Sequence, residues 1–270
     1  MKYCRFMDGG LTRYGRVEEH FDAFEITALA QAPEEDLKFK LETIGATASV
    51  REFKPAPLAA AELLPPVTPS KIICVGRNYR DHVKEMGSEM PAEPLLFFKP
   101  PSSLLRPGGT VRLPAMSQRV DFEGELALVI GRRAYKMSLE DNWREVVRGF
   151  TIANDISARD LQQKDSQWTR AKGFDTFCPV GPLVSDELDL DAGVTIETRV
   201  NGEVRQHAST LDFIFPVPVL LSYITSVLTL VPGDLILTGT PAGVGPLKAG
   251  DKVEVSITGL GTLANTVEAE

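Results

Sequence analysis

The sequence predicts an α+β fold in which strands dominate, helices are short, and a small N-terminal domain precedes a larger one. Runs that alternate between apolar and polar residues, as half-buried strands do, are clearest at 194–200 and 252–257. The helical segments are few and do not alternate regularly with the strands, so the repeated strand–helix–strand units of a parallel sheet are not expected. We therefore expect a mainly antiparallel or mixed core.

The N-terminal part differs from the rest of the chain. It consists of short alternating runs and ends in a proline-rich stretch at 64–70. Proline removes backbone donors and disfavours a helix, so we interpret this stretch as a linker. The sequence thus predicts two domains, 1–68 and 69–270.

The first half of the larger domain is a series of short elements. Gly76 ends the first strand, and Ser138 begins a capping arrangement in which its hydroxyl can accept from an early helical N–H. In order, we expect a buried strand at 72–75, a helix at 81–86, a strand at 95–98, a long strand at 120–130, a helix after Ser138 that buries Trp143, Val146 and Val147, and a strand at 150–153.

The C-terminal third is rich in strands, and Asn201-Gly202 is a strong signal for a hairpin turn. The apolar stretch 211–231 contains Pro216 and Pro218, which fit the first turn of a buried helix at about 218–228 better than they fit a membrane span. Strands are expected at 194–200, 234–238, 252–257 and 262–267.

Composition excludes several classes of partner. The net charge of -8 argues against nucleic acid, which requires a clustered basic surface. Cys4, Cys74 and Cys178 are far apart and form no CxxC pair, so neither a disulfide framework nor a thiolate zinc site is expected. Charged residues interrupt the N-terminus before a signal peptide could form. We expect a cytoplasmic protein with neither nucleic acid nor a membrane as partner.

Three carboxylates suggest a metal site. Glu123 and Glu125 share one face of a strand whose continuation is apolar on both faces, and Asp155 follows the strand at 150–153. Buried carboxylates need a counter-charge, and oxygen ligands suit Mg²⁺ or Mn²⁺. The alternatives are two solvated glutamates at an exposed strand end and an aspartate that caps a helix beginning at 156.

Further residues suggest a general base and substrate contacts. His82 and Glu85 lie one helical turn apart, so the carboxylate can orient the imidazole as a base; a surface ion pair is the alternative. Lys172 lies in an aromatic-rich loop and could stabilise a developing enolate, or it could be a surface lysine. Arg159 and Gln162 could present donors to a substrate carboxylate. The glycine-rich turn at 238–245 lacks the lysine and spacing of a nucleotide-binding loop.

Taken together and in this order, these segments resemble the fumarylacetoacetate hydrolase family over about residues 70–268. The matching stretches are Ile73-Cys74-Val75-Gly76-Arg77-Asn78-Tyr79 with His82 and Glu85, Phe122-Glu123-Gly124-Glu125-Leu126, Ala153-Asn154-Asp155-Ile156-Ser157-Ala158-Arg159-Asp160, Lys172-Gly173-Phe174-Asp175-Thr176-Phe177, and Leu237-Thr238-Gly239-Thr240-Pro241.

The resemblance implies a largely β roll with short helices, a homodimer, and Mg²⁺ or Mn²⁺ as cofactor. It implies that Glu123, Glu125 and Asp155 are the metal ligands. It also implies that His82, Glu85 and Lys172 are catalytic. The substrate-contacting positions that it implies are Arg77, Tyr79, Arg159, Gln162 and Thr240.

The activity expected from the resemblance is cleavage of a C–C bond in a small anionic 2-oxo or 2,4-dioxo acid through a metal-bound enolate. The reaction would be that of an acylpyruvate or fumarylpyruvate hydrolase or of an oxaloacetate decarboxylase. The alternatives are a keto–enol isomerase or decarboxylase of the 2-hydroxyhepta-2,4-diene-1,7-dioate type, and a sugar-acid dehydratase or diketo-sugar-acid hydrolase. A non-catalytic metal-binding protein is the alternative from outside the enzymes.

Overall fold

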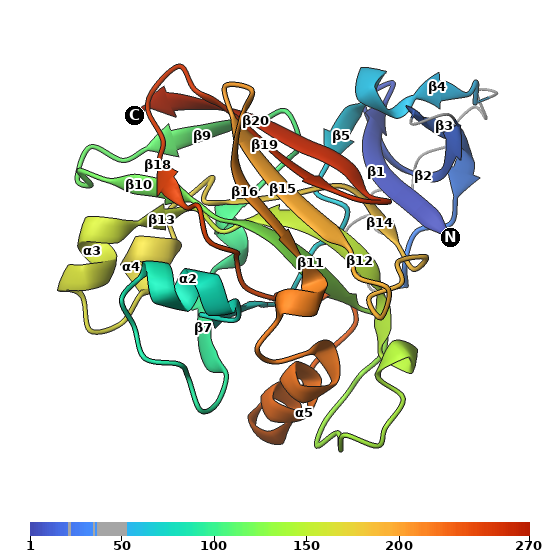
Figure 1. Cartoon of the computed structure of the whole chain (residues 1–270). Helices are drawn as coiled ribbons and strands as arrows, with labels where there is room; N and C mark the ends of the chain where they lie inside the picture. The colour runs from blue at the N-terminus through green and yellow to red at the C-terminus, as the bar shows by residue number, and fades with distance from the viewer. Residues whose placement is uncertain (21–22, 35, 37–52) are drawn as a thin grey trace.

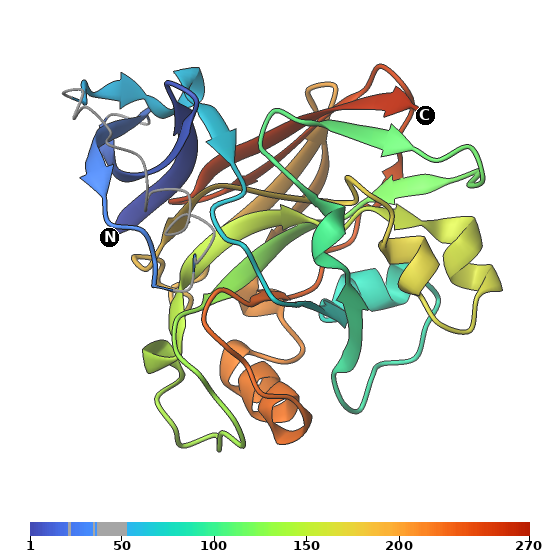
Figure 2. The same ribbon diagram turned by 180° about the vertical axis from the view of Figure 1, so that it is seen from behind.

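A computed structural model describes residues 1–20, 23–34, 36 and 53–270 of the chain. The described part is mostly β-structure, arranged as one large sheet and two smaller ones (Figures 1 and 2). This arrangement confirms the predicted α+β fold in which strands dominate. Residues 21–22, 35 and 37–52 of the predicted N-terminal domain lie outside the described residues.

The large sheet has twelve strands. Their order across the sheet is β4 (Ala56–Pro57), β3 (Ala23–Ala30), β2 (Leu11–His20), β1 (Lys2–Asp8), β14 (Cys178–Ser185), β12 (Val147–Asn154), β11 (Gly124–Ile130), β17 (Leu235–Leu237), β6 (Ile72–Gly76) and β7 (Leu95–Lys99), with β5 (Glu62–Leu64) and β8 (Leu104–Leu105) paired to β1 and β14.

The N-terminal strands continue this sheet. β1 pairs antiparallel with β14, with Lys2 opposite Ser185 and Tyr3 opposite Val184. The proline-rich stretch at 64–70 then connects β5 to β6, which lies at the other side of the sheet. The division into domains 1–68 and 69–270 remains a prediction.

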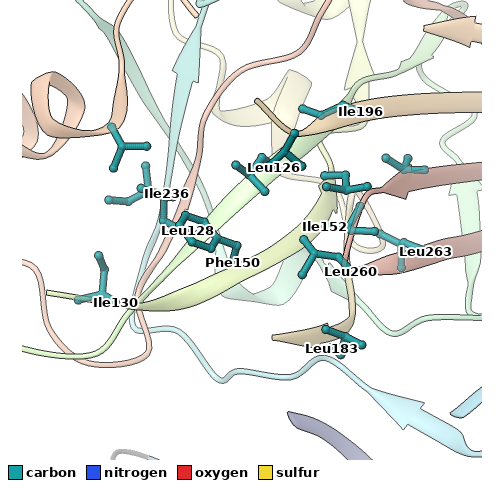
Figure 3. Close-up of a cluster of buried hydrophobic side chains, with 14 of the residues drawn as sticks. Leu126, Leu128, Ile130, Phe150, Ile152, Leu183, Ile196, Ile236, Leu260 and Leu263 are labelled. Carbon is teal, nitrogen blue, oxygen red and sulfur yellow. The ribbon is translucent and has the colours of Figure 1, made fainter. Parts of the chain in front are cut away.

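The second sheet packs on the first and closes the main core. It contains β16 (Glu203–Ser209), β15 (Thr195–Val200), β19 (Lys252–Ile257), β20 (Gly261–Ala269) and β9 (Thr110–Leu113). Figure 3 shows Leu126 and Leu128 of β11 in one cluster with Ile196 of β15 and Leu263 of β20. Each such side chain contributes about 1.5–3 kcal/mol when fully buried.

Residues of β11 alternate between two cores, because successive side chains of a strand point to opposite faces. Leu126 and Leu128 join the cluster of Figure 3, while Ala127 and Val129 join a second cluster with Cys74 and residues of β14. All seven residues of β11 are buried. The buried central strand that the sequence predicts is therefore confirmed.

The predicted long strand at 120–130 is interrupted at Glu123. β10 (Val120–Phe122) belongs to a three-stranded sheet with β13 (Ser157–Ala158) and β18 (Gly245–Pro246), whereas β11 belongs to the large sheet. At the break, the N–H of Glu123 donates to the side-chain oxygen of Asn154 at 2.9 Å. The chain thus changes sheets at the first of the predicted metal ligands.

The helices are short, as predicted. They are α2 (Arg80–Glu85), α3 (Arg159–Lys164), α4 (Thr169–Lys172) and α5 (Val217–Val227), with 3₁₀ turns η1 (Leu58–Ala60), η2 (Pro101–Ser103), η3 (Trp143–Glu145) and η4 (Thr210–Asp212). Helices α2, α3 and α4 gather at one side of the molecule (Figure 1). No helix in the described part of the chain has the length and apolarity needed to cross a membrane.

The predicted helix after Ser138 is wrong. That segment forms only the turn η3, which is capped by Asn142 rather than by Ser138. Trp143 and Val146 are only half-buried, and Val147 already begins β12. Strand β12 forms in place of the predicted helix because its residues pair with β11 immediately after the turn.

Candidate functional site

A cavity of about 300 Å³ lies among the three gathered helices and the ends of the central strands. Its volume is at the lower end of the range for small-molecule sites. It is lined by Val75, Gly76, Arg77, His82, Met86, Phe97, Glu123, Glu125, Asp155, Arg159, Gln162, Gln163, Trp168, Lys172 and Thr240. Most of the residues that the sequence singled out are therefore brought together at one place.

The three predicted metal-ligand carboxylates form one buried group. Oxygens of Glu123, Glu125 and Asp155 all lie within 4.8 Å of one another. A backbone hydrogen bond joins two of these residues: the N–H of Asp155 donates to the carbonyl of Glu123 at 2.8 Å. The readings of Glu123 and Glu125 as solvated and of Asp155 as a helix cap both fail, since the side chains are buried and Ser157–Ala158 is a strand.

Buried cations surround two of these carboxylates. Lys172 bridges them, donating to Glu123 Oε2 at 2.8 Å and to Asp155 Oδ2 at 2.7 Å. Lys99 donates to the other oxygen of Asp155 at 2.6 Å and to the carbonyl of Ile156 at 3.1 Å. Arg159 forms an ion pair with Glu123 Oε1. Lys172 is therefore not the surface lysine of the alternative reading.

The third carboxylate is held differently. Glu125 accepts a hydrogen bond from the backbone N–H of Gly239 at 2.7 Å. Burial raises the pKa of the Glu125 carboxyl well above its usual range, and the charges of Asp155 and Glu123 raise it further. Burial alone would also raise the pKa of Glu123, but Arg159 and Lys172 outweigh it and hold that pKa below its usual range.

The donor set fits a divalent cation. Three buried carboxylates offer only oxygen ligands, which is the chemistry that Mg²⁺ and Mn²⁺ prefer. Among the contacts of the described residues, Glu125 has no cationic partner. Burial, and then the charges of Asp155 and Glu123, disfavour its negative charge and so raise its pKa. A bound divalent cation would compensate that charge.

The predicted histidine–glutamate pair lies beside the acidic group. His82 is buried and lines the cavity, and its Nδ1 lies 3.2 Å from Glu85 Oε2. A carboxylate only accepts, so Nδ1 is the donor of this contact, and in the neutral tautomer that fits it Nε2 carries the lone pair. Glu85 is half-exposed and is fixed in turn by the N–H of Gly243, 3.0 Å from its Oε1. The pair is therefore more ordered than a casual surface contact.

Arg159 and Gln162 are both engaged with the protein. Arg159 donates through Nε to Asp121 and through Nη1 to Gln162, each at 2.9 Å, in addition to its ion pair with Glu123. Two of its five N–H donors stay available for a ligand. Arg77 lines the cavity from an exposed position and forms no ion pair with another described residue.

The hydroxyl of Thr240 is oriented by its neighbours. Gln206 accepts from the N–H of Gly124 at 3.0 Å and donates to the carbonyl of Pro241 at 2.8 Å, which fixes the orientation of its amide. The same amide donates to Thr240 Oγ1 at 2.8 Å, and Thr240 donates to the carbonyl of Gly124 at 3.0 Å. The remaining lone pair of the Thr240 hydroxyl can accept a hydrogen bond from a ligand.

Tyr79 does not line this cavity. Its ring lies in the main apolar core, where it packs edge-on against Phe213 with centroids 5.1 Å apart. The predicted role of Tyr79 as a substrate contact therefore has no support in the geometry. The residue is close to the site in sequence, but the extended backbone before α2 directs its side chain into the core.

Sequence reasoning missed two charged residues. Lys99 ends β7 and is 1% exposed, and Asp121 is fully buried between Arg119 and Arg159. The signal for Asp121 was present, since it begins the acidic stretch that contains Glu123. The sequence around Lys99 gave no such signal, because a lysine after an apolar strand usually marks an exposed strand end.

Comparisons with known proteins match the chain to two family models. A family model described as "Fumarylacetoacetate (FAA) hydrolase C-terminal" matches residues 71–268, and a model described as "Rv2993c-like, N-terminal" matches residues 1–66. Over 204 residues the chain is 45% identical to the mitochondrial oxaloacetate tautomerase FAHD1 of Arabidopsis thaliana, covering 74% of this chain and 91% of that protein.

Two solved structures share the fold. The 2-hydroxyhepta-2,4-diene-1,7-dioate isomerase of Mycobacterium marinum matches 100% of this chain and 99% of its own, with 41% identity and a TM-score of 0.83. The fumarylpyruvate hydrolase of Pseudomonas aeruginosa, in complex with Mn²⁺ and pyruvate, matches 76% of this chain and 91% of its own, with 33% identity and a TM-score of 0.70. These relatives confirm the predicted fold and differ in the reaction that their names give.

Proposed function

This chain belongs to the fumarylacetoacetate hydrolase family, and we propose that it catalyses the keto–enol interconversion of a small 2-oxo dicarboxylic acid such as oxaloacetate. One observation carries the proposal: an imidazole held by a carboxylate, a buried lysine and three clustered carboxylates line the same cavity. The 45% identity to an oxaloacetate tautomerase supports this choice of reaction.

Glu123, Glu125 and Asp155 are the residues that would hold Mg²⁺ or Mn²⁺. When bound, such a cation supplies Lewis-acid polarisation of a 2-oxo group. The complex of the Pseudomonas aeruginosa relative with Mn²⁺ and pyruvate supports this assignment.

His82 would act as the general base. Because Nδ1 keeps its hydrogen on the side of Glu85, the lone pair of Nε2 can accept a proton from C3 of the substrate. The C–H electrons then form the C2=C3 double bond, and the electrons of the C2=O bond move to oxygen. Removal of the C3 proton by a positioned base typically contributes a factor of about 10²–10⁴ to the rate.

Lys172 would protonate the C2 oxygen and complete the enol. Burial alone would lower the pKa of Lys172, but the charges of Asp155 and Glu123 outweigh it and raise that pKa. The side chain therefore carries the proton that it would donate. Reversal of the same transfers returns the ketone, so the residues that form the enol also consume it.

Anionic groups of the substrate would meet donors at the cavity edge. Arg77 has no ion pair among the described residues, and Arg159 retains two N–H donors beside Gln162. A substrate with a carboxylate at each end suits a site that has cationic groups at separate positions.

The same His82–Glu85 pair favours a second candidate, which is hydrolysis of a 2,4-dioxo acid such as an acylpyruvate. Nε2 could remove a proton from water as the water oxygen adds to the C4 carbonyl. The C3–C4 bond then breaks, giving a carboxylic acid and pyruvate enolate, which takes up a proton at C3. Decarboxylation of oxaloacetate leads to the same enolate without water.

An assay of three reactions tests the proposal. The purified protein is given Mg²⁺ or Mn²⁺, with EDTA as control, and the enol absorbance of oxaloacetate and acetylpyruvate is followed while pyruvate is measured separately. Metal-dependent acceleration of the oxaloacetate enol–keto change without pyruvate supports the tautomerase. Pyruvate from acetylpyruvate or from oxaloacetate favours hydrolysis or decarboxylation. No reaction in a sample that binds Mn²⁺ would contradict all three and favour the sugar-acid or non-catalytic alternatives.

A further inference from the structure

Two carboxylates of the proposed site are held by backbone N–H groups of one loop. This loop, 239–243, lies between β17 and β18. The N–H of Gly239 donates to Glu125 Oε2 at 2.7 Å. Four residues later, the N–H of Gly243 donates to both oxygens of Glu85, at 3.0 and 3.2 Å. One short segment therefore contacts both the acidic group and the histidine–glutamate pair.

Both positions require glycine. Gly239 has φ +100° and Gly243 has φ +102°, in the region that other residues rarely adopt. A Cβ at 239 would lie 2.8 Å from Cβ of Asn78, and a Cβ at 243 would lie 1.9 Å from the backbone oxygen of Arg205. At each position, the backbone conformation that favours glycine is also the one whose N–H donates to a carboxylate.

The segment between the two glycines is anchored independently. Gln206 donates to the hydroxyl of Thr240 and to the carbonyl of Pro241, each at 2.8 Å. On the other side, Asn78 donates to the carbonyl of Thr238 at 2.8 Å. These hydrogen bonds hold the backbone before Gly239 and between the two glycines.

We propose that Gly239 and Gly243 are positioning residues, the first for Glu125 as a metal ligand and the second for Glu85 as the partner of His82. Each acts through its N–H on a side chain that reaches the cavity or orients one that does. The roles of Gly239 in metal affinity and of Gly243 in turnover rest on the proposed function, whereas the two hydrogen bonds do not.

Three alanine variants separate the two roles: Gly239→Ala, Gly243→Ala and, as a control just beyond the loop at the first residue of β18, Gly245→Ala. The nearest atoms to a Cβ at 245 are the flexible end of the Arg205 side chain, at 3.1 Å, and the ring of Phe122, at 3.6 Å. Each variant is assayed for Mn²⁺ affinity by calorimetry and for oxaloacetate turnover with saturating Mn²⁺.

The expected results differ between the glycines. Loss of a hydrogen bond to a charged group should weaken Mn²⁺ binding by roughly 10- to 100-fold in Gly239→Ala. In Gly243→Ala, Mn²⁺ affinity should stay within about twofold of wild type while kcat falls roughly 10- to 100-fold and KM changes little. Gly245→Ala should match wild type in both. Parallel losses of affinity and turnover in both variants, or normal turnover in Gly243→Ala, would overturn the proposal.

Amide exchange tests the contacts without substrate, and it decides the case if an alanine variant does not fold. In NMR spectra of the full chain, the Gly243 amide hydrogen should exchange faster in Glu85→Ala than in wild type, and the Gly239 amide hydrogen should exchange faster in Glu125→Ala, because each substitution removes the acceptor. His82→Ala, the control, should leave both rates unchanged. Equal exchange in all proteins would refute the positioning role even if the wild type proved to have no activity on oxaloacetate.

Discussion

The ammonium of Lys172 lies 2.7 Å from Oδ2 of Asp155, within the group of carboxylates that we propose to bind a divalent cation. The same ammonium contacts Glu123. Lys172 and a metal ion would therefore both be held by the negative charges of Glu123 and Asp155. This relationship connects metal affinity with the protonation state of the proposed acid.

Replacing Lys172 by Met should separate binding from turnover. Because the substitution removes a positive charge close to the cation site, we expect Mn²⁺ to bind about tenfold more tightly. Turnover should fall by about 10² or more, since the proton donor is lost. Calorimetry and the enol assay measure the two effects, with Lys164→Met, at the exposed last position of α3, as control. Weaker Mn²⁺ binding would mean that Lys172 chiefly holds the carboxylates in place.

Lys99 should be important for stability. Its ammonium is fully buried on Asp155, and removing one partner of a buried ion pair costs about 3–5 kcal/mol. Lys99→Met should therefore lower Tm by roughly 10 °C in a thermal melt without metal. Lys84→Met, which breaks an exposed pair with Asp81, should shift Tm by less than about 3 °C. Similar shifts in the two variants would show that Lys99 is not part of a buried pair.

His82→Ala should distinguish the candidate reactions. If Nε2 accepts the proton from carbon or from water, turnover by tautomerisation or hydrolysis should fall by about 10²–10⁴. Decarboxylation needs no base and should fall less. Mn²⁺ affinity should remain near wild type, because His82 makes no contact with the three carboxylates among the hydrogen bonds of the described residues. Equal losses in all reactions would argue against a role as base.

The three cysteines should be unreactive in the folded protein. All are buried, and burial raises the pKa of Cys4 and Cys178 from 9.0 to about 12, and that of Cys74 well above 9.0. The thiols of the unfolded chain ionise near pH 9 while the folded ones stay protonated, so the unfolded state binds fewer protons there. The free energy of unfolding should therefore fall as pH rises from about 9 to 12.

Two measurements check this behaviour. Urea titrations at pH 8 and pH 10 should give a lower midpoint at pH 10, and a thiol reagent at pH 8 should react fully only after urea is added. Rapid reaction of any cysteine in the native protein would contradict the burial of the thiols.

The burial of the site's carboxylates was predictable because it follows from the local sequence pattern. Glu123 and Glu125 lie two residues apart before a run that is apolar on both faces, and Asp155 follows another apolar strand. Those patterns indicate burial without knowledge of the fold. The pairing of His82 with Glu85 follows in the same way from helical spacing.

Other features depended on how distant segments meet. Lys99 is buried only because β7 ends beside Asp155, and its sequence neighbourhood does not reveal that contact. The break at Glu123 arises because β10 and β11 pair with different sheets. Tyr79 belongs to a recognisable motif, yet its side chain enters the core, since the direction of a side chain depends on the backbone before α2.

Glu125→Gln provides the most direct test of the central claim that the three carboxylates form a metal-dependent catalytic site. The substitution keeps the size of the side chain and its acceptor for Gly239, but it removes one ligand charge. Mn²⁺ affinity is measured by calorimetry, and oxaloacetate tautomerisation is followed with and without added Mn²⁺. We predict that affinity falls by at least about tenfold and that activity falls with it, recovering in part at high Mn²⁺. Wild-type affinity and turnover in Glu125→Gln would contradict the account.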